Sequence, residues 1–225
     1  MTSDAMLRLV VFDCDGTLVD SQDTIFAAVR AAFESCNLLP PLPAVARRVI
    51  GLPLREAMAA LAPANCGIDT ALLTARYKDA FVTARSRPDF EEPLFPGALQ
   101  TLDVLQAEGY LLGIATGKGR RGLESTLARH NVLPRFVTLQ TSDAGPGKPH
   151  PAMLERALAE TGVEPAACVM VGDTTFDMQM AHAAGVKAVG VAWGYHAASE
   201  LIAAGADIIV TAFAELPAAV RELVP

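Results

Sequence analysis

Two aspartates, Asp13 and Asp15, directly follow an apolar run in the stretch VVFDCDGTLVDS. Two residues apart, they point the same way if the backbone continues as a strand, and Gly16 then permits a sharp turn. A second acidic pair, Asp173 and Asp177, follows another apolar run in VGDTTFDM. If the two runs are neighbouring strands of one sheet, these carboxylates converge. Several carboxylates around one point are typical of a site for a hard divalent cation, and Mg²⁺ is the usual one where phosphate supplies further ligands.

Groups that suit a phosphoryl group occur in two further loops. IATGKGRRG places the hydroxyl of Thr116 at the end of a predicted strand, followed by backbone N–H groups from Gly117 onward. GPGKPHP places Lys148 in a loop stiffened by glycine and proline, just before a helix. A hydroxyl, backbone donors and an ammonium can stabilise the charge of phosphoryl transfer. Lys118 follows in the first loop, where contact with a substrate anion is the alternative to a solvated helix start.

Strands and helices alternate between these motifs. Continuous apolar runs predict buried strands at 7–12, 111–116, 135–140, 168–172, 188–192 and 207–210. Continuous apolar character is typical of parallel strands that are covered on both faces. Helical patterns lie between the runs, at 98–108, 120–130, 152–161 and 175–184. The predicted fold class is α/β, with a doubly wound, mostly parallel, Rossmann-like sheet whose ligands bind at the C-terminal ends of the strands.

The region 21–90 interrupts this alternation. It contains helical patterns at 22–36, 54–61 and 70–87 but no convincing strand. Loops rich in proline mark its internal joints and the return of the chain. We therefore expect a core of residues 1–20 and 91–225 and an inserted all-helical cap of residues 21–90.

The motifs DCDGTLVDS, the strand end at Thr116, Lys148 and GDTTFD, in this order, resemble the four motifs of the haloacid dehalogenase-like hydrolase superfamily. The resemblance is closest to its phosphatases, specifically those similar to phosphoglycolate phosphatase with a helical cap inserted after the first motif. It covers essentially the whole chain. It implies a Mg²⁺-dependent phosphomonoester hydrolase that acts on a small phosphorylated metabolite through an aspartyl-phosphate intermediate.

The resemblance also implies a role for each residue that handles phosphate. Asp13 is expected to be the nucleophile that attacks phosphorus. Asp15 is expected to protonate the leaving alcohol and then to activate the hydrolytic water. Thr116 and the amide of Gly117 are expected to hold phosphate oxygens. Lys148 is expected to neutralise both the nucleophile and the phosphate.

For the metal, the resemblance implies Asp13, the backbone carbonyl of Asp15, and Asp173 as ligands of Mg²⁺. Asp177 is expected to support them, either on the metal or through water. It has a second interpretation, because an acidic residue in the first turn of a helix is favourable through the helix dipole. Thr17 is expected to brace the local backbone.

Two alternatives to a phosphatase stay open. A phosphomutase resembling β-phosphoglucomutase shares the core, but such relatives carry a basic residue before the cap-loop glycine, where this chain has Ile50 before Gly51. Arg47, Arg48 or Arg55 is available to replace that residue. The other alternative is a binding or regulatory protein without turnover, although the intact motif set argues against it. Within the cap, VIGLPLREA is the predicted substrate-reading loop and Arg55 its predicted substrate contact.

The composition narrows the expected partners. A formal net charge of -7 argues against a nucleic-acid or anionic-membrane binder, which shows a basic face. No stretch approaches the roughly 18 apolar residues that a membrane span requires. Four scattered cysteines and the lack of a recognisable signal peptide fit reduced thiols and a cytoplasmic location. The expected partner is a small-molecule phosphate ester, and the sequence leaves the oligomeric state open.

Overall fold

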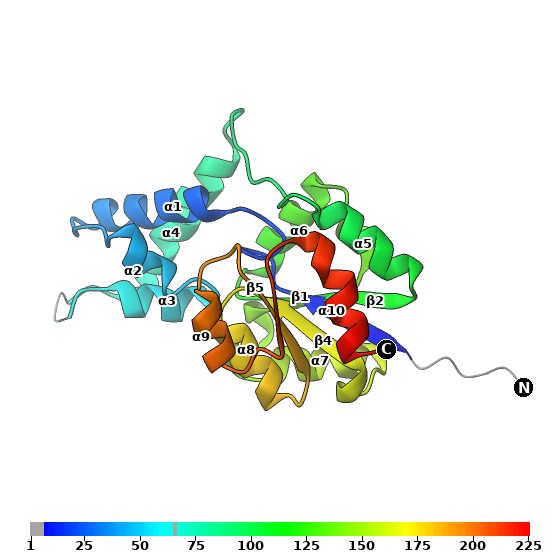
Figure 1. Ribbon diagram of the computed structural model, residues 1–225. Helices are drawn as coiled ribbons and strands as arrows, with labels where there is room; N and C mark the ends of the chain where they lie inside the picture. Colours follow the sequence, from blue (N-terminus) through cyan, green and yellow to red (C-terminus); the bar gives the residue numbers. More distant parts are fainter. Residues whose placement is uncertain (1–6, 65–66) are drawn as a thin grey trace, which may run out of the picture.

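The sheet determines where every motif lies. The computed structural model describes residues 7–64 and 67–225 of the chain. In this part of the chain six parallel strands pair in the order β3-β2-β1-β4-β5-β6 (Figure 1). The strands are β1 (Arg8–Phe12), β2 (Tyr110–Thr116), β3 (Phe136–Thr141), β4 (Cys168–Gly172), β5 (Lys187–Val191) and β6 (Ile208–Val210). The strand order reverses between β1 and β4, which is where ligands bind in sheets of this type.

Helices cover both faces of the sheet. Those of the sheet region are α5 (Ala98–Ala107), α6 (Arg120–Arg129), α7 (Ala152–Thr161), α8 (Thr175–Ala183), α9 (Ala198–Ala203) and α10 (Leu216–Leu223). Helices α5 and α10 lie together on one face, and α7 and α8 lie on the other (Figure 1). All five residues of β4, and all but the first of β1, are buried between these layers. The predicted doubly wound α/β fold is confirmed, while α9 and α10 had no counterpart in the sequence pattern.

A cluster of four helices lies beside the C-terminal ends of the strands (Figure 1). These helices are α1 (Gln22–Ser35), α2 (Pro43–Arg47), α3 (Leu54–Leu61) and α4 (Thr70–Arg85). They bury an apolar cluster that includes Phe33, Met58 and Leu73 and that Tyr195 of the sheet region joins. Helix α2 was not predicted from the sequence because its five residues, Pro43–Arg47, are too few to show a helical pattern.

The chain leaves the sheet region and returns to it at one place. Val19 and Leu94 form an isolated antiparallel bridge. The amide of Asp20 donates to the carbonyl of Pro93 at 2.8 Å, and the amide of Phe95 donates to that of Leu18 at 3.0 Å. These paired strands hold both connections to the helical cluster next to the acidic turn after β1. Residues 1–6 of the predicted core and 65–66 of the predicted cap lie outside the described residues.

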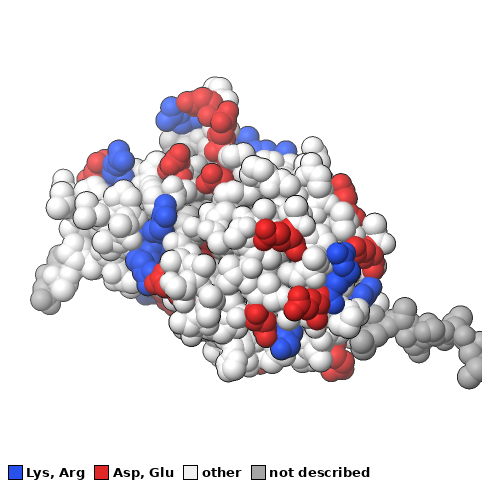
Figure 2. Space-filling view, viewed as in Figure 1, with Lys and Arg blue, Asp and Glu red and all other residues white. Residues whose placement is uncertain are grey.

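Surface charge is dispersed. Figure 2 shows acidic and basic side chains interspersed on one face of the molecule, with much of that face uncharged. Across the described residues, no helix combines the length and the apolar character needed to cross a membrane. Cys14 and Cys168 are buried and Cys36 is half-buried, all as free thiols, while Cys66 lies outside the described residues.

Candidate active site

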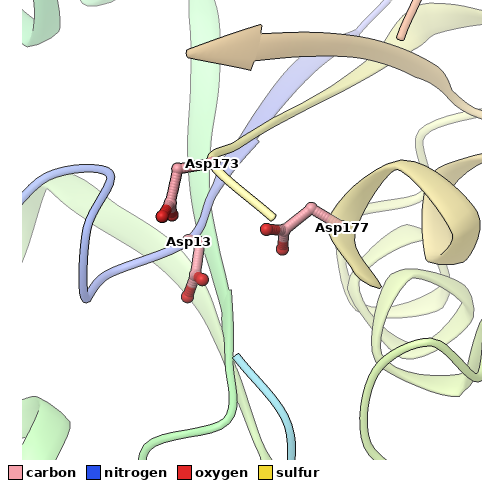
Figure 3. Close-up of side chains that lie close together, drawn as sticks. All are labelled: Asp13, Asp173 and Asp177. Atoms are coloured by element: carbon pink, nitrogen blue, oxygen red, sulfur yellow. The ribbon is translucent and has the colours of Figure 1, made fainter. Parts of the chain in front are cut away.

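The acidic residues meet because their strands are neighbours. Phe12, the last residue of β1, pairs with Val171 of β4, and the amide of Asp13 donates to the carbonyl of Val171 at 2.9 Å. Asp13 and Asp173 therefore emerge side by side from the sheet. Asp177 lies one turn into α8 and points back toward them, so that the three carboxylates face a common space (Figure 3).

This carboxylate cluster is buried and electrostatically unfavourable by itself. Asp13, Asp173 and Asp177 each offer an oxygen within 4.8 Å of the others, and all three side chains are buried. Burial raises the pKa of Asp13 to about 6, although Lys148 opposes part of the rise. Burial, with the charges of Asp13 and Asp177, raises the pKa of Asp173 well above its usual range. The cluster therefore needs more positive charge than the protein supplies.

Lys148 provides the protein's own cation at this site. Its ammonium lies 2.8 Å from Asp13 Oδ2 and 2.6 Å from Asp177 Oδ1. The side chain is fully buried. Burial acts to lower the pKa of Lys148, but Asp13 and Asp177 together raise it above the usual range, so the ammonium stays charged. With all three carboxyl groups ionised, one ammonium would leave the cluster with a net negative charge.

Asp173 is held by contacts from two loops. The hydroxyl of Thr17 donates to its Oδ1 at 2.7 Å, and the amide of Tyr195 donates to its Oδ2 at 2.9 Å. Glycines make room for it: a Cβ at Gly16 would lie 2.4 Å from Asp173 Oδ2, and one at Gly194 would lie 2.2 Å from Asp173 Cβ. Gly16 also has a φ of +83°, which other residues rarely adopt. Both loops therefore fix where the Asp173 carboxylate points.

Asp177 does two things at once. Its Oδ2 accepts hydrogen bonds from the amide and the hydroxyl of Thr174, at 3.0 and 2.7 Å, which closes a capping box at the start of α8. Its Oδ1 faces Lys148. The two interpretations of this residue from sequence are thus compatible, because one carboxylate both caps the helix and anchors the ammonium.

The predicted phosphate-binding groups lie across from the acidic cluster. Thr116 ends β2 and is buried, and Gly117 follows it in the loop to α6. Both line a cavity of about 550 Å³ together with Asp13 and Asp15. Gly117 has a steric role as well, since a Cβ there would lie 2.7 Å from the carbonyl oxygen of Leu52 in the helical cluster. The groups proposed to hold phosphate thus border the same cavity as the proposed nucleophile.

Lys118 contacts carboxylates of the protein. Its ammonium lies 2.7 Å from Asp15 Oδ1 and 3.4 Å from Glu92 Oε1. Burial acts to lower the pKa of Lys118, but Asp15 and Glu92 raise it above the usual range overall. Glu92 is itself buried and lies near Arg85 of α4, 3.6 Å away. The lysine therefore connects Asp15, the predicted acid–base residue, to Glu92 in the segment that returns to the sheet region. Through Glu92 it is also connected to Arg85 of the helical cluster.

The predicted reading loop lies at the site, but its arginine does not. Ile50, Gly51 and Leu52 line the cavity. Arg55 stands on the exposed side of α3 and is absent from the cavity lining. The predicted loop therefore borders the cavity and Arg55 does not, and contact of either with substrate stays a prediction.

The carboxylate cluster fits a divalent metal ion. One oxygen from each carboxylate lies within 4.8 Å of the others. Gly16 and Gly194 approach Asp173 so closely that a side chain at either position would collide with its carboxylate group. A set of hard oxygen donors carrying excess negative charge is typical of Mg²⁺ sites. Burial, with the neighbouring carboxylates, raises the pKa values of Asp13 and Asp173, and a metal ion would favour their ionised forms instead.

Comparison with known proteins identifies the family. The family model for the haloacid dehalogenase-like hydrolases matches residues 10–191. The chain belongs to this family. A relative from Dickeya dadantii (strain 3937), named "Probable phosphatase IndB", is 34% identical over 220 residues, covering 97% of this chain and 95% of the relative. A phosphoglycolate phosphatase of Haemophilus influenzae (strain 86-028NP) is 30% identical over 222 residues, covering 93% and 96%.

The fold of this haloacid dehalogenase-like hydrolase is also found in solved structures. A family member from Streptococcus pneumoniae superimposes with a TM-score of 0.82 at 25% identity, over 95% of this chain and 98% of that one. The predicted family is therefore confirmed, and with it the predicted class of enzyme, a hydrolase of the phosphatase type.

Three contributors to the site did not emerge from the sequence. Thr17 was expected to brace backbone, and its hydroxyl instead donates to Asp173. Tyr195 contributes a backbone amide, which no side-chain pattern can signal. Glu92 is a buried carboxylate in a segment that reads as a polar, proline-rich connection. Its only signal was that two acidic residues precede Pro93 at the predicted return to the core.

Proposed function

We propose that the protein hydrolyses phosphomonoesters in a Mg²⁺-dependent reaction through an aspartyl-phosphate on Asp13. One observation carries the proposal: the Asp13 carboxylate lies beside Lys148 and Asp173 at the wall of a cavity that Asp15 and Thr116 also line. Nucleophile, charge partner, acid–base residue and phosphate donors are thereby within reach of one substrate phosphoryl group.

In the first step, an oxygen of Asp13 forms a bond to phosphorus while the bond from phosphorus to the ester oxygen breaks. The ammonium of Lys148 offsets negative charge on the nucleophile and on the phosphoryl oxygens. The hydroxyl of Thr116 and the amide of Gly117 hold those oxygens. Asp15, in its protonated form, gives its proton to the leaving alkoxide, which departs as the alcohol.

In the second step, Asp15 removes a proton from a water molecule. The water oxygen bonds to phosphorus, and the bond between phosphorus and Asp13 breaks, which releases inorganic phosphate and restores both carboxyl groups. Lys118 fixes where the Asp15 side chain lies during both proton transfers. The same residue thus acts first as an acid and then as a base.

Mg²⁺ is the proposed metal, held by the carboxylates of Asp13 and Asp173 and the backbone carbonyl of Asp15, with Asp177 in support. When bound, it supplies the positive charge that allows an anionic nucleophile to approach an anionic ester. Asp177 contributes in addition by anchoring Lys148.

We propose that residues 21–90 form a cap domain on a core of residues 1–20 and 91–225. Support comes from the separate apolar cluster of α1–α4 and from the paired connections at Val19 and Leu94. The cap would exclude bulk water and contact the leaving group. A small-molecule phosphate ester in the cytoplasm remains the expected substrate and setting.

The phosphomutase alternative receives no support from the cavity. A mutase of the kind considered above needs a basic cap residue near Gly51. The cavity-lining residues between positions 25 and 61 are all apolar or glycine. Arg47, Arg48 and Arg55 are absent from its lining.

Phosphate release from a panel of phosphomonoesters tests the proposal. We expect release with Mg²⁺, none with EDTA, and none from Asp13→Asn, while Asp89→Asn, which removes an exposed carboxylate, behaves as wild type. After an acid quench, mass spectrometry should find one phosphoryl group on the peptide that contains Asp13. Release that persists in Asp13→Asn would overturn the proposal.

A further inference from the structure

The cavity beside Asp13 is larger than a phosphate group requires. Its volume is about 550 Å³, within the range of roughly 300–1,000 Å³ that is typical of pockets for drug-sized ligands. Asp13, Asp15 and Thr116 border one part of it, α6 and the loop before it border a second, and the helical cluster borders a third. The leaving group of a substrate whose phosphoryl group lies at Asp13 would therefore occupy the part of the cavity that the helical cluster borders.

The wall formed by α1, α3 and the loop between α2 and α3 is apolar throughout. The cavity-lining residues between positions 25 and 61 have no charged or hydrogen-bonding side chain. The larger of these side chains are Ile25, Val29, Val49, Leu52, Met58 and Leu61. A polar or anionic leaving group facing this wall would lose its hydration without gaining a partner, which is costly.

Helix α4 adds an aromatic pair to this wall. The rings of Tyr77 and Phe81 are 5.9 Å apart and stacked, and both line the cavity. The Lys118 ammonium lies 5.0 Å from the centre of the Phe81 ring, between the apolar wall and the catalytic carboxylates. Lys78 and Arg85 of the same helix also line the cavity, so charged residues come from α4, α6 and the strand ends, while the wall of positions 25–61 is apolar.

Five basic side chains line the cavity, all outside the wall formed by positions 25–61: Lys78, Arg85, Lys118, Arg121 and Arg129. Two of them are already engaged by the protein. Arg85 donates to the carbonyl of Gly122 and to the hydroxyl of Thr126. Lys118 is paired with Asp15 and Glu92. Neither of these side chains is oriented to bind a second anion on the leaving group.

We propose that the preferred substrates are phosphomonoesters of apolar alcohols, with an alkyl or aryl body of several carbons that lies against Val49, Leu52 and Phe81. This inference rests on the proposed phosphatase activity and adds the class of leaving group. It ranks alkyl or aryl leaving groups above a small charged one such as glycolate, because the wall formed by positions 25–61 offers a charged group no partner.

A series of straight-chain alkyl phosphates, from methyl to hexyl, tests this directly. Their leaving alcohols have nearly the same chemistry, so the chain length changes only the contact with the wall. We expect kcat/KM to rise about two- to fourfold for each added methylene, where fourfold corresponds to ~0.8 kcal/mol per buried methylene. A flat or falling series, or a preference for phosphoglycolate over hexyl phosphate, would overturn the inference while leaving a phosphatase in place.

A matched pair of variants locates the contact. Val49 lines the cavity, whereas Val45 is 49% exposed and does not. In Val49→Asn the ratio of kcat/KM for hexyl over methyl phosphate should fall at least about tenfold, because a polar amide replaces apolar surface. In Val45→Asn this ratio should stay as in wild type. Equal ratios in both variants would contradict the proposed position of the chain.

Binding separates this inference from the proposed function. Asp13→Asn, titrated calorimetrically with hexyl and with methyl phosphate in the presence of Mg²⁺, reports affinity without turnover. Tighter binding of hexyl phosphate with no turnover by wild type would refute the phosphatase proposal and keep the apolar site. Equal affinity for both esters would refute the apolar site, whatever the activity.

Discussion

Lys118 Nζ lies 2.7 Å from Asp15 Oδ1, in a contact that is almost entirely removed from solvent. Sequence pattern alone suggested that this lysine touches the substrate anion. The structure pairs it with the proposed acid–base residue and, on its other side, with the buried Glu92. Glu92 is a buried carboxylate outside the cavity lining, and it holds Lys118, the partner of the proposed acid–base residue Asp15. Glu92 is therefore a positioning residue. Its effect should depend on how much the leaving group needs a proton.

Glu92→Gln should impair reactions that need the proton from Asp15 more than those that do not. We expect kcat to fall roughly tenfold for an alkyl phosphate, a part of the 10²–10⁴-fold that general acid–base catalysis contributes. For p-nitrophenyl phosphate, whose leaving group departs as the anion, the loss should be severalfold smaller. Steady-state kinetics on both substrates measure the difference. The neighbouring Glu91, which is exposed, gives the control variant Glu91→Gln. Equal losses on both substrates would mean that Glu92 only supports the fold.

Mg²⁺ should stabilise the protein more as the pH rises. The pKa of Asp13 is about 6 in the folded protein against 3.8 for an ordinary aspartate. Between these values the folded state keeps a proton that the unfolded chain loses, so without metal the stability from this group declines as the pH rises. Asp173, whose pKa is also raised by burial, acts in the same direction. Mg²⁺ binds the ionised carboxylates and reverses the loss.

Thermal unfolding with Mg²⁺ and with EDTA measures this effect. At a metal concentration about 100 times Kd, we expect Tm near pH 7.5 to rise by about 5–10 °C. Near pH 5 the rise should be much smaller, because protons compete for the same oxygens. Asp173→Asn should lose most of the rise, and Asp89→Asn should retain it. A rise in Tm that is independent of pH would show that the metal binds elsewhere.

Thr17→Val should weaken metal binding without removing a metal ligand. The hydroxyl of Thr17 donates to Asp173 at 2.7 Å and is buried. Partners of this kind orient a ligand, and their loss typically lowers metal affinity about 10–100-fold. The Mg²⁺ concentration that gives half-maximal activity should rise accordingly, with kcat at saturating Mg²⁺ much less affected. Thr161→Val, which removes a hydroxyl at the end of α7 that bonds only to backbone, is the matched control. The same rise in both variants would contradict the role of Thr17.

Much of this site was predictable because its residues follow strands. Continuous apolar runs predict parallel strands, and parallel strands bring their C-terminal ends to one edge of the sheet. Asp13 and Asp173 could therefore be placed together from sequence, and β1 and β4 are indeed neighbours. The ion pairs of Lys148 were not predictable in detail. They depend on how far the loop after β3 folds back over the cluster.

The positions of Arg55 and Glu92 depend on packing between distant segments, which the local sequence does not give. Arg55 looked suitable because cations bind phosphate, but the phase of α3 turns it to solvent and turns Met58 inward. Glu92 was not singled out in the sequence, and its burial goes with the approach of Lys118 and Arg85 from two other elements. Local composition does not determine the phase of a helix or the pairing of charges from distant segments. The sequence motifs therefore predicted the residues at the strand ends better than those of the cap.

Gly117→Ala should act through the position of the helical cluster. A Cβ at Gly117 would lie 2.7 Å from the carbonyl oxygen of Leu52 and 2.8 Å from that of Gly51. Both atoms belong to backbone and cannot swing aside as a side chain can, so the loop after α2 must move away from the proposed phosphate-binding loop. We expect KM to rise at least severalfold, with a loss of kcat as well, because a displaced cap admits water and holds the leaving group poorly.

Gly122→Ala is the matched control for that substitution. Gly122 lies in α6, where its Cβ would meet only the side chain of Lys118, at 3.4 Å. Alanine in a helix interior is favoured over glycine by roughly 0.5–1 kcal/mol, so this variant should unfold at an equal or higher temperature and keep its KM. Kinetics and thermal unfolding of the two variants separate a steric effect on the cap from a general effect of the added methyl group. If Gly117→Ala kept the wild-type KM, residues 50–53 would not have to lie against the phosphate-binding loop during the reaction, and the leaving group would have to be recognised elsewhere.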